Sequence, residues 1–374
     1  MKKLFSILYV LIVQIVFAQN EQYNDVVHYY HSQKNFNGIV LVATDGKIDY
    51  LTGIGISNRQ TGTTMNAKTK FKIASITKTF TAVLVLQLHQ QGKIDLNVPF
   101  GKYYPTYKGD AKDKVTIQQL LTYSSGIPNA VENLHLKPYQ LPLTLDEFID
   151  QYCSEKVAFT PGEKSNYSNT EYTILHKIIE NVSKTSFASL LQENILNPLQ
   201  MVNTGMLNAK DIIAGLSSSY TLEESTNQIT ADEPYFIENY FGSAAMYSTV
   251  EDLLTFNNAL LTNRLLNAST TNLLLQPNKQ LDGATLGGLW YSDGYGTFNK
   301  PFIYRTGGLL GSCSNWIHSM EDKKTIIVFN NVNGTNLYEL SEQLYRVSTG
   351  QKPTIPSYER KENNSKTANL DAIK

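Results

Sequence analysis

Cysteine is scarce in this sequence: there are two in 374 residues, Cys153 and Cys313. Small secreted domains that rely on disulfides carry a framework of several cysteines, so two cysteines exclude that class. A single bridge between them would require a geometry that the sequence does not specify. We therefore expect two separate, partly buried thiols, with one disulfide as the alternative.

An excess of charge of one sign is also missing. The 32 Lys and Arg residues balance 33 Asp and Glu residues, and the net charge is −1. This balance gives no overall basic bias toward nucleic acid or an anionic membrane, so we expect neither as a partner. The sequence does not specify an oligomeric state.

Long apolar runs are confined to the N-terminus. Lys2 and Lys3 precede an almost entirely apolar run, Leu4–Phe17, which is followed by Ala18. This run is shorter than the roughly 20 apolar residues of a membrane-spanning helix. Basic, apolar and small residues in this order are typical of a signal peptide. We expect residues 1–18 to be cleaved after Ala18, and the protein to be periplasmic or secreted without a membrane span.

Metal-binding spacings and one common serine motif are absent as well. The six histidines show no paired spacing of the kind that holds zinc, so we expect no metal, and we expect no other cofactor. The Gly-x-Ser-x-Gly motif of the α/β-hydrolases does not occur either.

Strand patterns occur near both ends of the chain. The segment GIVLVATDGKIDYLTGIG predicts two strands joined at Asp45-Gly46, because Asp-Gly between apolar runs is a strong hairpin signal. The C-terminal third predicts further strands and a closing helix, in this order: 286–298, 301–308, 312–320, 324–332 and, for the helix, 335–347.

The middle of the chain is mostly helical in pattern, from about 115 to 266. Residues 80–88 are apolar nearly all round the helix axis, which predicts a helix buried in the interior and ending near Gly92. Thr144–Glu147 and Ser248–Glu251 each match a capping box, in which Ser or Thr precedes Glu by three residues.

These patterns favour an α/β fold with one antiparallel sheet built from both chain ends, flanked by helices, and an all-α region inserted between them. We expect one catalytic domain over 19–350. Its α/β parts would cover about 19–80 and 285–350, and its helical region about 81–284. Residues 351–374 are polar and expected to be loose. A site would lie where sheet and helical region meet.

The buried helix begins near Ser75 and Lys78, the only Ser-x-x-Lys pair in the chain. Residues three apart on a helix share a face, and the N–H groups at a helix start can stabilise an oxyanion. Burial lowers the pKa of a lysine, which can then accept the proton of the serine. The alternative is that Ser75 only caps the helix and Lys78 reaches the surface.

Two further motifs accompany this pair. Tyr167 and Asn169 lie in a loop that ends where a helix begins. A phenol near cations can ionise and act as a base, whereas Asn169 could be a plain N-cap. Arg305, Thr306 and Gly307 end a strand, where the glycine lets the backbone approach a ligand closely. An ordinary strand end is the alternative there.

The order Ser-x-x-Lys, Tyr-x-Asn, basic-Thr-Gly resembles that of the serine beta-lactamase and penicillin-binding-protein superfamily. The closest likeness is to the branch of class C beta-lactamases, DD-peptidases and esterases, over roughly 38–347. LLTYSSGIPN, FTPGEKSNYSN and GSAAMYSTVEDLLTF fit the same branch. The resemblance implies a beta-lactamase/transpeptidase-like fold, in agreement with the strand and helix patterns.

The resemblance also implies a role for each motif residue. The catalytic residues would be Ser75 as the nucleophile, Lys78 as its activating partner, and Tyr167 as the general base and acid. The implied substrate-binding residues are Asn169, Arg305, Thr306 and Gly307, and the implied oxyanion hole is formed by the backbone N–H groups of Ser75 and Gly308.

Two positions depart from the family pattern. Arg305 stands where Lys or His is usual, and Tyr123 stands where His is common. Arginine keeps its positive charge and does not release a proton. We therefore expect Arg305 to bind a substrate carboxylate, and Tyr123 to be structural.

The resemblance implies an exported serine hydrolase that acts through an acyl-enzyme on Ser75. Its substrates would be D-alanyl-type peptides, small esters or beta-lactams, with peptidase or esterase activity favoured over efficient beta-lactamase activity. One alternative is an acyltransferase that uses the same site. The other is a non-catalytic binder or sensor of acyl ligands with a repurposed site.

Overall fold

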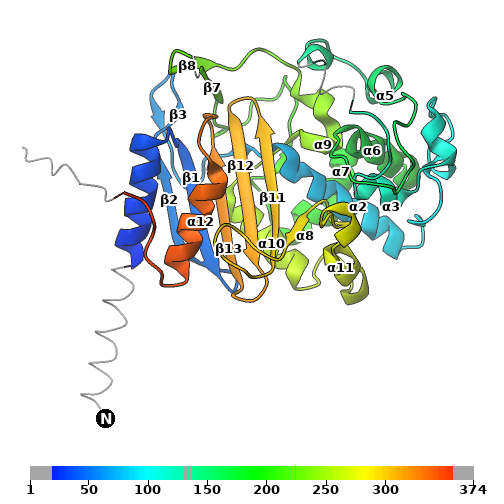
Figure 1. Ribbon diagram of the computed structural model, residues 1–374. Coiled ribbons are helices and arrows are strands. Elements are labelled where there is room, and N and C mark those ends of the chain that lie inside the picture. The colour runs from blue at the N-terminus through cyan, green and yellow to red at the C-terminus, as the bar shows by residue number, and fades with distance from the viewer. Residues whose placement is uncertain (1–18, 130–133, 135, 224, 357–374) are drawn as a thin grey trace, which may run out of the picture.

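The computed structural model describes residues 19–129, 134, 136–223 and 225–356. The predicted signal peptide and most of the predicted C-terminal tail lie outside these residues. Within them, no helix has both the length and the apolar character needed to cross a membrane. Figure 1 shows a twisted layer of strands with helices on both faces and a larger helical region at one side.

One six-stranded antiparallel sheet joins the two ends of the chain (Figure 1), in the order β10-β11-β12-β13-β1-β2. Its strands are β1 (Gly38–Thr44), β2 (Lys47–Ile54), β10 (Trp290–Ser292), β11 (Phe302–Leu309), β12 (Ser312–Ser319) and β13 (Lys324–Asn330). N-terminal β1 pairs with C-terminal β13, so that Val40 lies opposite Val328. The predicted sheet built from both chain ends is confirmed.

The turn between β1 and β2 has the geometry that its two residues favour. Asp45 has a φ of 48° and Gly46 a φ of 77°. Positive φ at both central positions is characteristic of a type I′ hairpin turn, for which Asp-Gly is well suited. The predicted hairpin is confirmed.

Both faces of the sheet are buried beneath helices. Helical residues 19–33 and α12 (Leu337–Ser348) cover one face, where they pack against Val40. α10 (Val250–Leu261) lies on the other face, where Leu41 points. Successive residues of a strand point to opposite faces. The unbroken apolar run of β1 follows from this double burial.

The inserted region is predominantly helical, as predicted, and also contains short strands that the sequence patterns did not indicate. The helices are α2 (Thr77–Gln90), α3 (Ile117–Leu121), α5 (Leu145–Tyr152), α6 (Thr170–Ser183), α7 (Phe187–Leu191), α8 (Asn197–Leu199), α9 (Phe241–Ala244), α10, and α11 (Ala268–Leu275). Its short strands are β6 (Gly205–Met206), β7 (Tyr220–Glu223), β8 (Gln228–Ala231) and β9 (Met246–Ser248), whereas β3 (Ile56–Asn58), β4 (Thr63–Thr64) and β5 (Phe71–Lys72) precede α2.

One of the two predicted capping boxes is correct and the other is wrong by one residue. Thr144 and Glu147 form both hydrogen bonds of the box at the start of α5. At α10 the cap is Thr249, whose side chain accepts from the backbone N–H of Asp252. Ser248 belongs to β9, and its hydroxyl bonds with Thr204. Strand pairing therefore delays the helix start by one residue.

The two cysteines are separate, as expected. Cys153 is a buried free thiol that follows α5, and Cys313 is a partly buried free thiol in β12. Of the predicted loose tail, residues 351–356 are described, and Thr354 is hydrogen-bonded to the side chain of Gln343 on α12.

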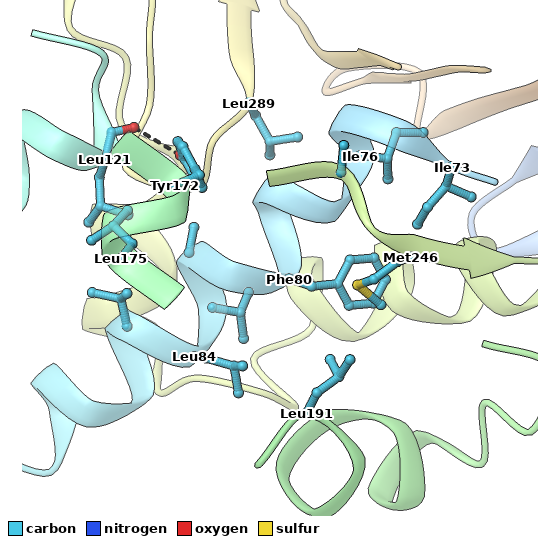
Figure 2. Close-up of a cluster of buried hydrophobic side chains, with 14 of the residues drawn as sticks. Ile73, Ile76, Phe80, Leu84, Leu121, Tyr172, Leu175, Leu191, Met246 and Leu289 are labelled. Atoms are coloured by element: carbon cyan, nitrogen blue, oxygen red, sulfur yellow. Dashed lines mark hydrogen bonds between the residues drawn. The ribbon is translucent and has the colours of Figure 1, made fainter. Parts of the chain in front are cut away.

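Helix α2 is buried because α6, α9 and α11 surround it. Figure 2 shows Phe80 and Leu84 of α2 packed among side chains from several other elements, including Tyr172 and Met246. The ring of Phe80 stacks on that of Phe256, with 3.8 Å between ring centroids. This packing carries the polar start of α2 into the interior.

Replacement of Phe80 should show how much α2 depends on this packing. Phe80→Ala removes a fully buried ring, and we expect the free energy of unfolding to fall by about 3–5 kcal/mol. Ile212→Ala is the control, because Ile212 is fully exposed and its loss should change stability by less than about 0.5 kcal/mol. Chemical denaturation measures both, and equal stabilities would contradict the packing argument.

Candidate active site

Ser75 lies in a single 3₁₀ turn, Ala74–Ile76, between β5 and the start of α2. Ala74 has a φ of 46°, a left-handed conformation that is strained for a residue with a β-carbon. Two serines of β12 hold the preceding backbone, since Ser312 donates to the carbonyl of Lys72 and Ser314 to that of Ile73. The sheet thus fixes the turn that presents Ser75.

The ammonium group of Lys78 is enclosed in the protein, and the side chain is fully buried. Its Nζ donates to Ser75 Oγ at 3.1 Å, to Asn169 Oδ1 at 2.6 Å and to the carbonyl oxygen of Ser243 at 3.1 Å. Burial lowers the pKa of Lys78 to about 8, although Tyr167 acts in the opposite direction. The alternative in which Lys78 reaches the surface is wrong.

Asn169 precedes the first residue of α6, but its side chain makes no capping hydrogen bond there. Its Oδ1 instead accepts from Lys78. Asn169 is therefore not a plain side-chain N-cap, because its acceptor is occupied by the lysine.

The phenol of Tyr167 also contacts Ser75. Its Oη lies 2.6 Å from Ser75 Oγ, and its ring centroid lies 4.8 Å from Lys78 Nζ. The residue as a whole is 37% exposed, while its hydroxyl contacts Ser75 and Arg305. Burial raises the pKa of Tyr167, but the positive charges of Arg305 and Lys78 outweigh this effect and lower the pKa to about 8.

Arg305 of β11 is 1% exposed and points toward the nucleophile turn. Its Nε donates to the carbonyl oxygen of Ser75 at 2.9 Å, Nη1 to Tyr123 Oη at 3.0 Å, and Nη2 to Tyr167 Oη at 2.8 Å. These three acceptors hold the guanidinium toward the interior and bond to three of its five N–H groups. The placement does not support the expected contact with a substrate carboxylate.

Two buried cations thus share a site that supplies them with no nearby carboxylate. In the described ranges, neither Lys78 nor Arg305 has a carboxylate oxygen within 4.0 Å. Glu171 is also buried, and its Oε1 accepts from Ser125 Oγ at 2.6 Å. Burial raises the pKa of Glu171 well above its usual range, although the hydrogen bonds with Ser125 and the charge of Lys78 act in the opposite direction.

Strand β11 passes directly beside the Ser75 turn. A β-carbon on Gly307 would lie 2.4 Å from the carbonyl oxygen of Ile73, so only glycine permits this approach. A β-carbon on Gly308 would meet nothing within 4 Å. Thr306 is exposed and paired with Asn315, whose amide bonds with α12, so alternation places its side chain on the far face of the sheet from Arg305.

Comparison with known proteins agrees with this geometry. The sequence profile of the family described as Beta-lactamase matches residues 21–351. The chain belongs to the beta-lactamase family. The resemblance inferred from the motif order is thereby confirmed, and the antiparallel sheet with its helical insertion matches the beta-lactamase/transpeptidase-like fold.

Two similar proteins come from Staphylococcus aureus. Protein flp of Staphylococcus aureus strain N315 is 28% identical over 82% of this chain. The match covers 61% of that relative, so this chain spans less than two thirds of its length. Teichoic acid D-alanine hydrolase of S. aureus strain MRSA252 is 26% identical over 80% of this chain and 72% of its own.

A solved structure shows the same fold. D-amino acid amidase from Ochrobactrum anthropi SV3, in complex with D-phenylalanine, superposes with a TM-score of 0.76 at 20% sequence identity. The superposition covers 89% of this chain and 99% of the amidase chain. At this level of identity the superposition shows a shared fold.

The structure brings together the predicted residues Ser75, Lys78, Tyr167, Asn169 and Arg305. It adds two contacts that the sequence reasoning did not assign. Ser243 contributes a backbone carbonyl, which no side-chain motif can reveal, although its segment GSAAMYSTV fits the beta-lactamase branch. Tyr123 contributes a hydroxyl, and its departure from the family pattern was the available signal.

The two glycines of β11 provide a matched pair of variants. Gly307→Ala should push the Ser75 turn away from the strand, and displacement by about 1 Å typically lowers reactivity by about 10²-fold. Gly308→Ala places its methyl group in open space and should leave reactivity nearly unchanged. The rate at which a fluorophosphonate labels Ser75 measures both effects, and equal rates would argue against contact between β11 and the turn.

Tyr167 should ionise at a lower pH than the other tyrosines. Its pKa of about 8 predicts that tyrosinate forms as the pH rises through about 8. The near-ultraviolet absorbance of tyrosinate, taken as the difference between wild type and Tyr167→Phe, isolates this group among the 23 tyrosines. A difference spectrum that develops only around pH 10 would show that the two cations do not act on the phenol.

Proposed function

We propose that the protein is an exported serine hydrolase that forms an acyl-enzyme on Ser75. One observation carries the proposal: Ser75 Oγ lies within hydrogen-bonding distance of both Lys78 Nζ and Tyr167 Oη. A serine hydroxyl becomes nucleophilic when a neighbouring base accepts its proton. The family membership supports the same chemistry. Export is part of the proposal and rests on the signal peptide expected at residues 1–18.

In the first half of the reaction, Tyr167 in its ionised form accepts the proton of Ser75. Ser75 Oγ then attacks the substrate carbonyl carbon, and the carbonyl oxygen becomes an oxyanion. The backbone N–H groups of Ser75 and Gly308 donate to this oxyanion. When the tetrahedral intermediate collapses, the bond to the leaving group breaks and Tyr167 gives its proton to the leaving amine or alcohol.

The second half repeats these steps with water. Tyr167 accepts a proton from a water molecule, which attacks the acyl carbon. The ester bond to Ser75 breaks, and Ser75 Oγ recovers the proton from Tyr167. Lys78 and Arg305 keep the phenol poised for proton transfer through their positive charge, and Asn169 holds Lys78 in place.

The substrate we favour is an ester or amide of a D-amino acid. Two relatives carry names that refer to such substrates, teichoic acid D-alanine hydrolase and D-amino acid amidase. D-alanyl-D-alanine peptides and beta-lactams carry a carboxylate close to the scissile bond. The guanidinium of Arg305 is buried and directed toward protein acceptors, so it is poorly placed to bind that group. This placement ranks D-aminoacyl esters and amides above carboxylate-bearing substrates.

A substrate panel tests the nucleophile, the base and the preference together. Intact-protein mass spectrometry should detect one acyl adduct per chain, absent in Ser75→Ala. Tyr167→Phe keeps the ring but removes the proton carrier, and turnover should fall by about 10²- to 10⁴-fold. D-alanine methyl ester should react faster than D-alanyl-D-alanine.

Three results would count against this proposal. An adduct that persists in Ser75→Ala would remove the nucleophile. Near-normal turnover by Tyr167→Phe would show that Lys78, and not Tyr167, accepts and donates the proton. A single turnover per enzyme molecule on every substrate would favour a non-catalytic binder of acyl ligands.

A further inference from the structure

The Tyr123 side chain is placed where the mechanism above assigns it no task. It is completely buried, and its hydroxyl accepts from Arg305 Nη1 at 3.0 Å. Its ring lies 4.9 Å from that of Tyr167 and stacks on that of Trp290 at 5.4 Å, between ring centroids. Tyr123 therefore contacts both members of the Arg305–Tyr167 hydrogen bond, and among the described residues it makes no hydrogen bond to Ser75 or Lys78.

The backbone of Tyr123 is held in an unfavourable conformation. Its φ is 58°, the left-handed region that residues with a large side chain rarely adopt. Its carbonyl oxygen accepts from the backbone N–H of Asn166 at 2.8 Å, which ties it to the residue preceding Tyr167. Residues in such conformations persist where the surroundings over-determine them, often at functional sites. The backbone bond from Asn166 and the side-chain bond from Arg305 thus hold Tyr123 in its strained conformation.

The forked guanidinium explains why this position needs an acceptor. An arginine directs its terminal N–H groups in fixed directions, whereas a lysine ammonium is a compact group that rotates freely. With Nε bonded to the Ser75 carbonyl, Nη1 and Nη2 diverge toward two different acceptors. Tyr167 satisfies one and Tyr123 the other. Without the Tyr123 hydroxyl, a buried cationic N–H would lose its partner, and only two of the three hydrogen bonds that orient the fork would remain.

We propose that Tyr123 is a positioning residue that holds the Arg305 fork in register, so that Nη2 stays on the oxygen of Tyr167. The proposal rests on the function proposed above, because it assigns Tyr167 as the base. It also accounts for the two departures from the family pattern together. Arg305 and Tyr123 act as a matched pair, in which the larger cation requires the additional hydroxyl.

The charged and titratable groups around Tyr167 determine how its pKa should respond when the Tyr123 hydroxyl is removed. Its oxygen faces Arg305 from β11 and Lys78 from α2, and the uncharged phenols of Tyr123, Tyr172 and Tyr139 lie nearby. Removing the Tyr123 hydroxyl takes away the acceptor of Arg305 Nη1, and it also changes the surroundings of the Tyr172 phenol. The expected consequence is weaker stabilisation of tyrosinate at Tyr167.

The test compares wild type with Tyr123→Phe, which keeps the ring and removes the hydroxyl. We expect the pKa of Tyr167 to rise by about one pH unit. Near pH 8, kcat should fall roughly tenfold while KM stays unchanged. A loss of this size corresponds to one charge-assisted hydrogen bond. KM should stay constant because Tyr123 does not face the substrate. Tyr107→Phe is the matched control, since its buried hydroxyl bonds with the backbone carbonyl of Cys153.

A double-mutant cycle separates positioning from packing. In an Arg305→Lys background there is no fork to hold, so adding Tyr123→Phe should cause no further loss of kcat and no further shift of the titration. If Tyr123→Phe alone does not fold, the comparison of Arg305→Lys with the double variant still decides the question. A further loss of activity or stability in the double variant would show that the hydroxyl acts independently of Arg305.

The spectroscopic readout keeps the two proposals distinguishable. The titration of Tyr167 requires no substrate, so it tests the role of Tyr123 even if no ester is hydrolysed. An unchanged titration in folded Tyr123→Phe would overturn the positioning role, as would an equal shift in Tyr107→Phe. Failure of Ser75 to acylate in wild type would overturn the proposed function and leave the Tyr123 result intact.

Discussion

The rest of the site depends on two buried positive charges that have no carboxylate oxygen within 4.0 Å among the described residues. Lys78 and Arg305 both lie close to the phenol of Tyr167, and burial raises the pKa of the nearby Glu171 carboxyl well above its usual range. Desolvated cations persist only where neutral acceptors or a nearby anion compensate them. The acceptors here are amides, carbonyls and hydroxyls. The site therefore favours negative charge on the phenol or on a substrate oxyanion.

The sheet is what brings these charges together. Arg305 comes from the C-terminal strand β11, whereas Ser75 and Lys78 follow the N-terminal hairpin. These segments meet because β1 pairs with β13, and because β12 carries the serines that hold the Ile73 backbone. The close approach of Gly307 completes the contact. The position of the nucleophile is thus a property of the sheet as much as of α2.

The inward direction of Arg305 connects this architecture to substrate choice. A cation exposed at the strand would select a carboxylate, whereas a cation bonded to protein acceptors acts on the base instead. The same strand position can therefore serve recognition or proton transfer, depending on where its side chain is directed. In this protein the Tyr123 hydroxyl accepts from Arg305 Nη1, so the arginine is directed toward protein acceptors.

Local patterns in the sequence determined the hairpin at Asp45-Gly46 and the buried helix α2, because turn conformation and apolar periodicity depend on neighbouring residues. The motif order also indicated the family and most of the site. Only the tertiary structure decided that Ser243 lends a carbonyl to Lys78, and that Arg305 turns toward Tyr123. These contacts join segments that lie more than 100 residues apart in the chain. No local pattern encodes them, because the direction of a side chain at a strand end depends on which acceptors the fold places beside it.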